Sequence, residues 1–177
     1  MTCTTYHLGL DPGVKNLGYA LLKKERGKIS VVKTFTLDSA EYFTMTLFAR
    51  GIIEEATDYG RRELSTVTIE RFVPFAGGST ASGVMEDINL LIGAISGIIL
   101  ERKLPEPLLV RSVEWKTRLV KSLVRSKGFS NPSTSLDKKF SFAAAAAVLD
   151  VPYNEKITDH VADSIAIAAY PLINLYK

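Results

Sequence analysis

Four polar side chains stand beside apolar segments, at positions from which a fold could gather them around metal. They are Asp11, Glu70, His160 and Asp163. Asp11 follows the apolar segment YHLGL, and Glu70 ends the β-rich run STVTIE. A carboxylate at the end of a buried strand loses hydration, which is costly unless another charge compensates it. A divalent cation shared by several carboxylates supplies that compensation, so the pattern indicates a metal site.

The last strongly patterned segment carries three candidate ligands close together. His160 and Asp163 are three residues apart in TDHVADSIAIAAY, which places them on one face of a predicted helix over Thr158–Tyr170. Asp159 opens the same helix, where an acidic side chain complements the helix dipole. Asp159 therefore has an ordinary structural explanation, and it is also an alternative to His160 as a ligand.

The elements that must position these residues follow from the hydrophobic periodicity. Their predicted order is βββαβαβααα, which favours an α/β domain over residues 1–177 with a mixed five-stranded sheet and helices on both faces. Trp115 is expected on the outer side of its amphipathic helix or at an edge. The predicted strands are Tyr6–Leu10, Leu17–Leu22, Ile29–Leu37, Leu64–Ile69 and Leu108–Val110, and the predicted helices are Ser39–Gly60, Val84–Lys103, Val113–Val124, Asp137–Leu149 and Thr158–Tyr170.

The composition is that of a globular protein, with 46% hydrophobic and 23% charged residues. The single cysteine excludes an intrachain disulfide and a cysteine-based metal site, and a reducing cytoplasm fits best. The N-terminal sequence lacks the features of a signal peptide. The longest apolar run, Ile88–Leu100, is interrupted by Asn89 and glycines and is shorter than a membrane span. We therefore expect no membrane partner.

Basic residues are concentrated in one part of the chain. The net charge is only +3, yet the segment from Arg111 to Lys139 holds eight basic and two acidic residues. A local basic block on a nearly neutral chain indicates a polyanionic partner, although a solvated basic helix and loop would give the same pattern.

Three motifs together resemble the RuvC-like Holliday junction resolvases of the RNase H-like superfamily. LGLDPGVKNLGYALL resembles the first strand–turn–strand of that family, TVTIERFVPF its second acidic strand, and DHVADSIAIAAY its C-terminal helix. The resemblance implies an RNase H-like fold and a metal-dependent endodeoxyribonuclease that cuts four-way junctions by paired symmetrical nicks. It also implies two ions per site, Mg²⁺ or Mn²⁺, held by Asp11, Glu70, His160 and Asp163. Most family members have Asp where His160 stands, while some have His.

The resemblance extends to DNA contacts and assembly. The helix VEWKTRLVK and the residues after it resemble the DNA-contacting region, with Phe72 or Phe75 able to stack on an unpaired base. Two symmetrical nicks imply a homodimer, and the apolar helix over Val84–Leu100 is the candidate interface unless it only packs on the sheet. The candidate DNA-binding residues are Lys116, Arg118, Lys121, Lys127, Phe72 and Phe75.

Other functions share parts of this pattern. Another RNase H-like nuclease, acting on branched DNA or on RNA–DNA hybrids, would carry the same four metal-binding residues, here called the tetrad (Asp11, Glu70, His160 and Asp163). A junction-binding module that does not cleave would gain by losing these negative charges. The turn DPGVKNLG also fits actin-like ATPases, but those need a second domain and a longer chain. The resemblance implies that the protein acts in the cytoplasm of a bacterial or phage-infected cell. It does not indicate whether the protein has a branch-migration partner.

Overall fold

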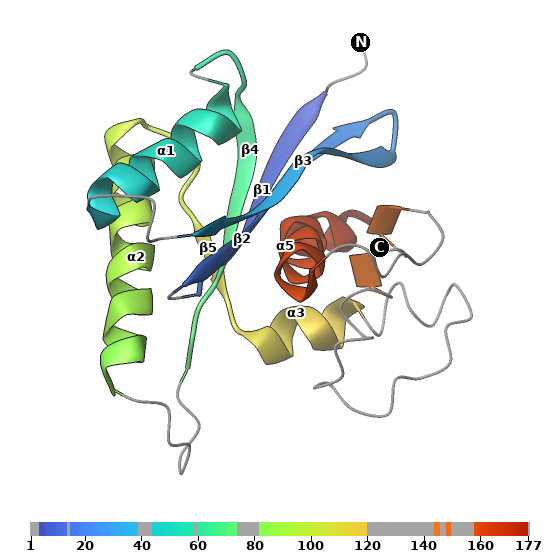
Figure 1. Cartoon of the computed structure of the whole chain (residues 1–177). Coiled ribbons are helices and arrows are strands. Elements are labelled where there is room, and N and C mark those ends of the chain that lie inside the picture. The colour runs from blue at the N-terminus through green and yellow to red at the C-terminus, as the bar shows by residue number, and fades with distance from the viewer. Residues whose placement is uncertain are drawn as a thin grey trace.

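The computed structural model describes residues 4–13, 15–38, 44–58, 60–73, 82–119, 144–145, 148–149 and 158–176. Five strands form one mixed sheet in the order β3-β2-β1-β4-β5 (Figure 1). β1, β2 and β3 are antiparallel neighbours, whereas β4 runs parallel to both β1 and β5. The predicted mixed five-stranded sheet is confirmed. The strands are β1 (Thr5–Asp11), β2 (Asn16–Glu25), β3 (Lys28–Asp38), β4 (Leu64–Glu70) and β5 (Leu108–Val110).

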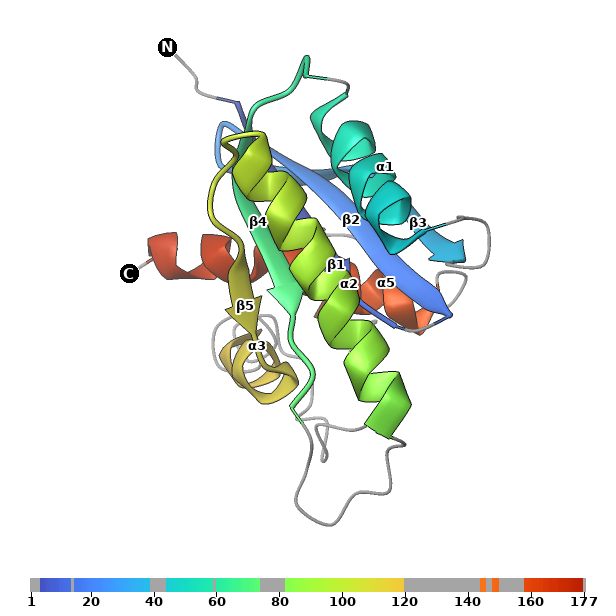
Figure 2. The same cartoon turned by 90° about the vertical axis from the view of Figure 1, so that its left-hand side faces the viewer.

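Helices cover both faces of the sheet, as predicted. α1 (Met45–Thr57) and α2 (Ser82–Glu101) lie on one face, and α3 (Ser112–Leu119) and α5 (Asp159–Ala169) lie on the other (Figures 1 and 2). A 3₁₀ helix, η3 (Tyr170–Tyr176), follows α5 directly. Each face has its own apolar core. The first core includes Leu8, Leu10, Phe48, Ile52 and Ile95, and the second includes Val110, Trp115, Val161, Ala162 and Ile165.

The strand predictions are confirmed with small extensions, and the helix ends differ more. The helix predicted from Ser39 begins at Met45, because the Thr44 hydroxyl caps it by accepting a hydrogen bond from the Leu47 N–H. It ends before Asp58, which has left-handed backbone angles and stops the helix. The predicted helix over Asp137–Leu149 lies mainly outside the described residues.

The expectation that Trp115 lies on the outer side of its helix or at an edge is wrong. Its side chain is 0% exposed and belongs to the core between the sheet and α5. The reason is the position of α3, which follows the edge strand β5 and packs against α5 and η3. The side of α3 that carries Trp115 therefore packs into the second core.

Two glycines let α5 lie directly on the strands that carry the site. A Cβ atom at Gly9 would stand 2.2 Å from the Ser164 carbonyl oxygen, and one at Gly18 would stand 2.2 Å from the His160 carbonyl oxygen. These separations are far inside van der Waals contact, so neither position accommodates any other residue without movement of α5. The depth of α5 on the sheet is therefore set by backbone atoms.

We expect Gly18→Ala to destabilise the fold by about 2 kcal/mol, because the added methyl group must push the first turn of α5 away from β2. Urea unfolding measures the loss. Gly83→Ala is the matched control, since a Cβ there meets nothing within 4 Å and a helical Ala is favoured over Gly. Equal stability of the two variants would contradict the close contact between α5 and β2.

Candidate active site

Asp11 and Glu70 end two neighbouring parallel strands. β1 and β4 pair with Leu10 opposite Ile69, so the next residue on each strand, Asp11 or Glu70, falls at the same edge of the sheet. The carboxyl ends of parallel strands form the edge at which α/β sheets bind ligands. The structure thus brings together two carboxylates that are far apart in sequence.

The first turn of α5 delivers His160 to the same edge. Thr158 caps this helix by accepting a hydrogen bond from the Val161 N–H. Nδ1 of His160 lies 2.8 Å from Oδ2 of Asp11. Because an ionised carboxylate can only accept, Nδ1 is the donor in this hydrogen bond, and Nε2 has a free lone pair whenever the ring is neutral. The hydrogen bond to Asp11 is the main cause that raises the pKa of His160.

Glu70 lies in a crowded and mostly buried environment. Burial, followed by the charge of Asp11, raises the pKa of Glu70 to about 7. The Trp115 indole N–H donates to Oε2 of Glu70 at 2.7 Å and opposes this rise, as does the charge of Lys116. Negative charge is therefore concentrated at the site beyond what the nearby donors compensate.

Asp163 completes the group from the second turn of α5. Its Oδ1 atom is buried, and its charge raises the pKa of both Glu70 and His160. Asp159, next to His160 in sequence, also raises the pKa of His160. These interactions place Asp11, Glu70, His160 and Asp163 near one another. Whether His160 or Asp159 completes the site stays a prediction.

The donor set fits a hard divalent cation. Three carboxylates and one imidazole provide oxygen and nitrogen ligands of the kind that Mg²⁺ and Mn²⁺ accept. In the part of the chain that the structure describes, no group of three His, Cys, Asp or Glu side chains is already arranged to hold a metal ion. Hydrogen bonds from His160 and Trp115 engage two of the carboxylates instead. That these residues bind metal remains a prediction.

The sequence matches no family model and no curated protein. Solved structures do match. The structure of Thermus thermophilus RuvC in complex with a Holliday junction substrate aligns with a TM-score of 0.70 at 15% identity, covering 97% of this chain and 95% of that one. The present chain has the RuvC fold.

Two further structures agree with this assignment. Thermus thermophilus RuvC alone aligns with a TM-score of 0.68 at 16% identity, covering 97% of this chain and 95% of that one. A yeast mitochondrial Holliday junction resolvase aligns with a TM-score of 0.57 at 15% identity, covering 96% of this chain and 80% of that one. The predicted RNase H-like fold class is confirmed, and a phage source stays a prediction.

Only some of the predicted DNA-binding residues lie near the acidic edge of this RuvC fold. Lys116 is close enough to lower the pKa of Glu70, and its Nζ stands 4.9 Å from the centre of the Trp115 ring. Arg118 instead packs on the ring of Tyr170, which follows the end of α5 opposite His160. Phe72 is partly exposed just beyond β4. Lys121, Lys127 and Phe75 lie outside the described residues.

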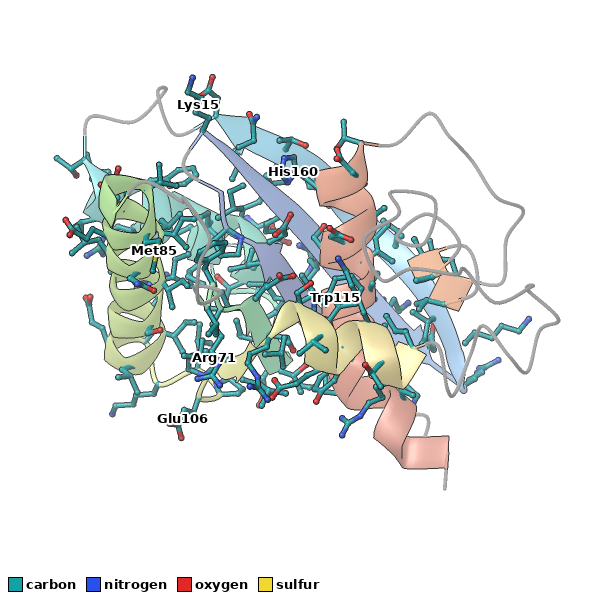
Figure 3. The ribbon with its side chains drawn as sticks, turned by 90° about the horizontal axis from the view of Figure 1, so that it is seen from below. Lys15, Arg71, Met85, Glu106, Trp115 and His160 are labelled. Atoms are coloured by element: carbon teal, nitrogen blue, oxygen red, sulfur yellow. The ribbon has the colours of Figure 1, made fainter. Side chains whose placement is uncertain are left out.

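Sequence reasoning missed the hydrogen bond from Trp115 to Glu70. Trp115 and His160 lie on the same side of the sheet, on α3 and α5 (Figure 3). Arg71 is exposed and directly follows Glu70, and its charge acts on Glu114, which pairs with Arg111. The burial of Trp115 had no local signal.

Proposed function

We propose that this protein is a structure-specific endodeoxyribonuclease that resolves four-way DNA junctions by paired symmetrical nicks. The observation that carries the proposal is the gathering of Asp11, Glu70, His160 and Asp163 at one sheet edge of a RuvC fold. Solved structures with the same fold include a RuvC bound to a Holliday junction and a mitochondrial Holliday junction resolvase, which supports the same substrate here.

Each member of the tetrad has a role that its position allows. Bound divalent ions, two of Mg²⁺ or Mn²⁺, would activate the attacking water and stabilise charge on the departing 3′ oxygen. Asp11 lies beside both Glu70 and His160, so it is the ligand best placed to be shared, with Glu70 and Asp163 as the others. His160, oriented by Asp11 through Nδ1, would direct Nε2 at an ion or at the attacking water.

Cations around the edge would hold the DNA backbone. Lys116 stands beside Glu70, and Arg71 lies one residue beyond it, so both can contact phosphates that flank the cleaved bond. Such contacts make binding fall steeply with salt. Phe72, partly exposed next to Arg71, is the described candidate for stacking on an unpaired base.

α2 is the proposed dimer interface, because symmetrical nicks need two active sites. Its inner face belongs to the first core, and Ile95 and Ile99 are fully buried. Its outer face exposes Leu90 at 62% and Leu100 at 64%, with Gly93 and Gly97 between them. The helix thus packs on the sheet and also leaves an apolar face on which a second copy could pack closely.

The same helix bears on the expectation that the chain has no membrane partner. Residues Gly83–Glu101 are long and apolar enough to cross a membrane, by length and composition alone. A membrane span would have to place Glu86 and Asp87, both exposed in the first turns, near lipid. The buried inner face and the exposed acids favour a second copy of this chain as the occupant.

Leu90→Glu should weaken the dimer at least about 30-fold, since burying an unpaired charge at a tightly packed centre costs about 2 kcal/mol or more. Sedimentation over a range of protein concentrations measures the change. Val113→Glu, which alters a similarly exposed residue (57%) on the opposite side of the sheet, should leave the dimer intact. A wild-type protein that is monomeric, or that binds detergent micelles through this face, would contradict the interface.

The proposed function is tested on a synthetic immobile four-way junction with Mg²⁺ or Mn²⁺, beside linear duplex, Y-shaped DNA and an RNA–DNA hybrid. We expect paired symmetrical nicks in the four-way junction alone. Preferential cutting of the Y-shaped DNA or of the hybrid would indicate a different nuclease of this fold. Tight junction binding without cutting would leave a structure-specific binding module.

A further inference from the structure

Trp115 is the single tryptophan of the chain, and it lies wholly inside the second core. It belongs to the same core cluster as Val110 at the end of β5 and as Val161 and Ala162 on α5. An indole surrounded in this way has no room to change its rotamer. The direction of its N–H group is therefore fixed by packing.

That fixed N–H group points at Glu70. Nε1 of Trp115 donates to Oε2 of Glu70 at 2.7 Å, which is a short hydrogen bond. The main chain of Glu70 is held as well, because Glu70 pairs with Val110 on β5 and the next N–H group, from Arg71, donates to the Val110 carbonyl at 2.8 Å. One carboxylate oxygen and the backbone of Glu70 are thus held by the same region, which leaves Oε1 for a further ligand.

We propose that Trp115 is a positioning residue that holds Oε2 of Glu70, so that Oε1 ligates a divalent cation beside Asp11 and Asp163. This inference rests on the proposed nuclease function for its biological purpose. An indole N–H can donate but cannot accept, so it binds the ionised carboxylate without competing for the cation. Groups that orient metal-ligating side chains in this way typically change metal affinity or activity by about 10- to 100-fold when removed.

The bond makes Trp115 an intrinsic reporter of the site. A cation that arrives at Glu70 changes the electric field at the only indole in the protein. We expect the tryptophan emission of the full-length, EDTA-treated protein to change saturably as Mg²⁺ is added without DNA. Glu70→Gln keeps an oxygen that accepts from the indole but loses the charge, so its emission should respond only weakly.

Trp115→Phe separates positioning from packing. It keeps an aromatic ring in the core and removes only the donor and part of the ring. We expect the Mg²⁺ concentration for half-maximal cleavage, and that for the Mg²⁺-induced rise in Tm, to increase about 10-fold or more. Excess Mg²⁺ should restore the rate, and junction affinity without metal should stay unchanged. Phe48→Leu, in the core on the other face, is the control that lowers Tm without shifting either Mg²⁺ midpoint.

The possible results separate the two proposals. Trp115→Phe with a lower Tm but unchanged Mg²⁺ midpoints would show that Trp115 only packs, and so would a wild-type protein that nicks junctions without any change in emission. A protein that cuts no junction yet shows the Glu70-dependent emission change would overturn the nuclease function and support the role of Trp115 in holding a metal ligand.

Discussion

Asp11→Asn should reduce junction cleavage by roughly 10³-fold or more while leaving junction binding intact. Asp11 accepts the hydrogen bond from His160 and lies close enough to Glu70 to raise the pKa of Glu70. It therefore interacts with the residues from α5 and with the residue from β4. Its loss removes the ligand best placed to be shared by the cations. Metal ions contribute several kcal/mol of transition-state stabilisation, and about 4 kcal/mol corresponds to a factor of 10³.

Single-turnover cleavage of the four-way junction measures this loss, and gel-shift titration in EDTA measures binding. Binding should be unchanged or slightly tighter, since one negative charge facing the phosphates is gone. Asp159→Asn is the matched control, because it removes the carboxylate next to His160 and leaves Asp11 and its hydrogen bond to His160 in place. If Asp159→Asn were as damaging as Asp11→Asn, Asp159 would replace His160 in the tetrad.

Glu70→Gln is expected to abolish cleavage and yet to stabilise the metal-free protein at pH 8, by up to about 3 kcal/mol. The pKa of Glu70 is raised from 4.5 to about 7 by burial and by Asp11. Between these values the folded protein keeps a proton that the unfolded chain has lost. The contribution of Glu70 to stability is therefore fully present below about pH 4.5 and is lost as the pH rises through about 7.

Unfolding free energies of wild type and Glu70→Gln, measured in EDTA from pH 5 to 8, test this prediction. The difference between the two proteins isolates Glu70 from His7, whose pKa is lowered to about 4 by burial and whose titration acts in the opposite direction. The advantage of Glu70→Gln should grow with pH and should shrink when Mg²⁺ is added to the wild type. A difference independent of pH would refute the crowding of charge around Glu70.

The sequence was most informative where a single local pattern decided the outcome. Strand periodicity predicted all five strands, and the positions of Asp11 and Glu70 at strand ends implied a shared edge. Helical spacing predicted that His160 and Asp163 share a face, and the structure brings both to that edge. These features depend only on residues near one another in sequence and on the general rule that sites lie at strand ends.

The features that the sequence did not reveal depend on contacts between distant segments. The Trp115–Glu70 bond joins residues 45 positions apart, and an eight-residue helix has too little periodicity to decide which side faces inward. Composition likewise could not show which side chain of the first turn of α5 hydrogen-bonds to Asp11, and in the structure His160 does so. That choice depends on the rotation of α5, which Gly9 and Gly18 fix by admitting backbone contact.

The separation of the apolar residues into two cores has a consequence for protein engineering. Among the described residues, the core under α2 and the core around Trp115 and α5 are separate clusters with the sheet between them (Figure 1). The α2 surface could therefore be redesigned into complementary halves that pair only with each other, without repacking the residues around Glu70. In the proposed dimeric junction nuclease, a wild-type protomer joined in this way to an Asp11→Asn protomer would cut one strand of a junction and leave the symmetry-related strand intact.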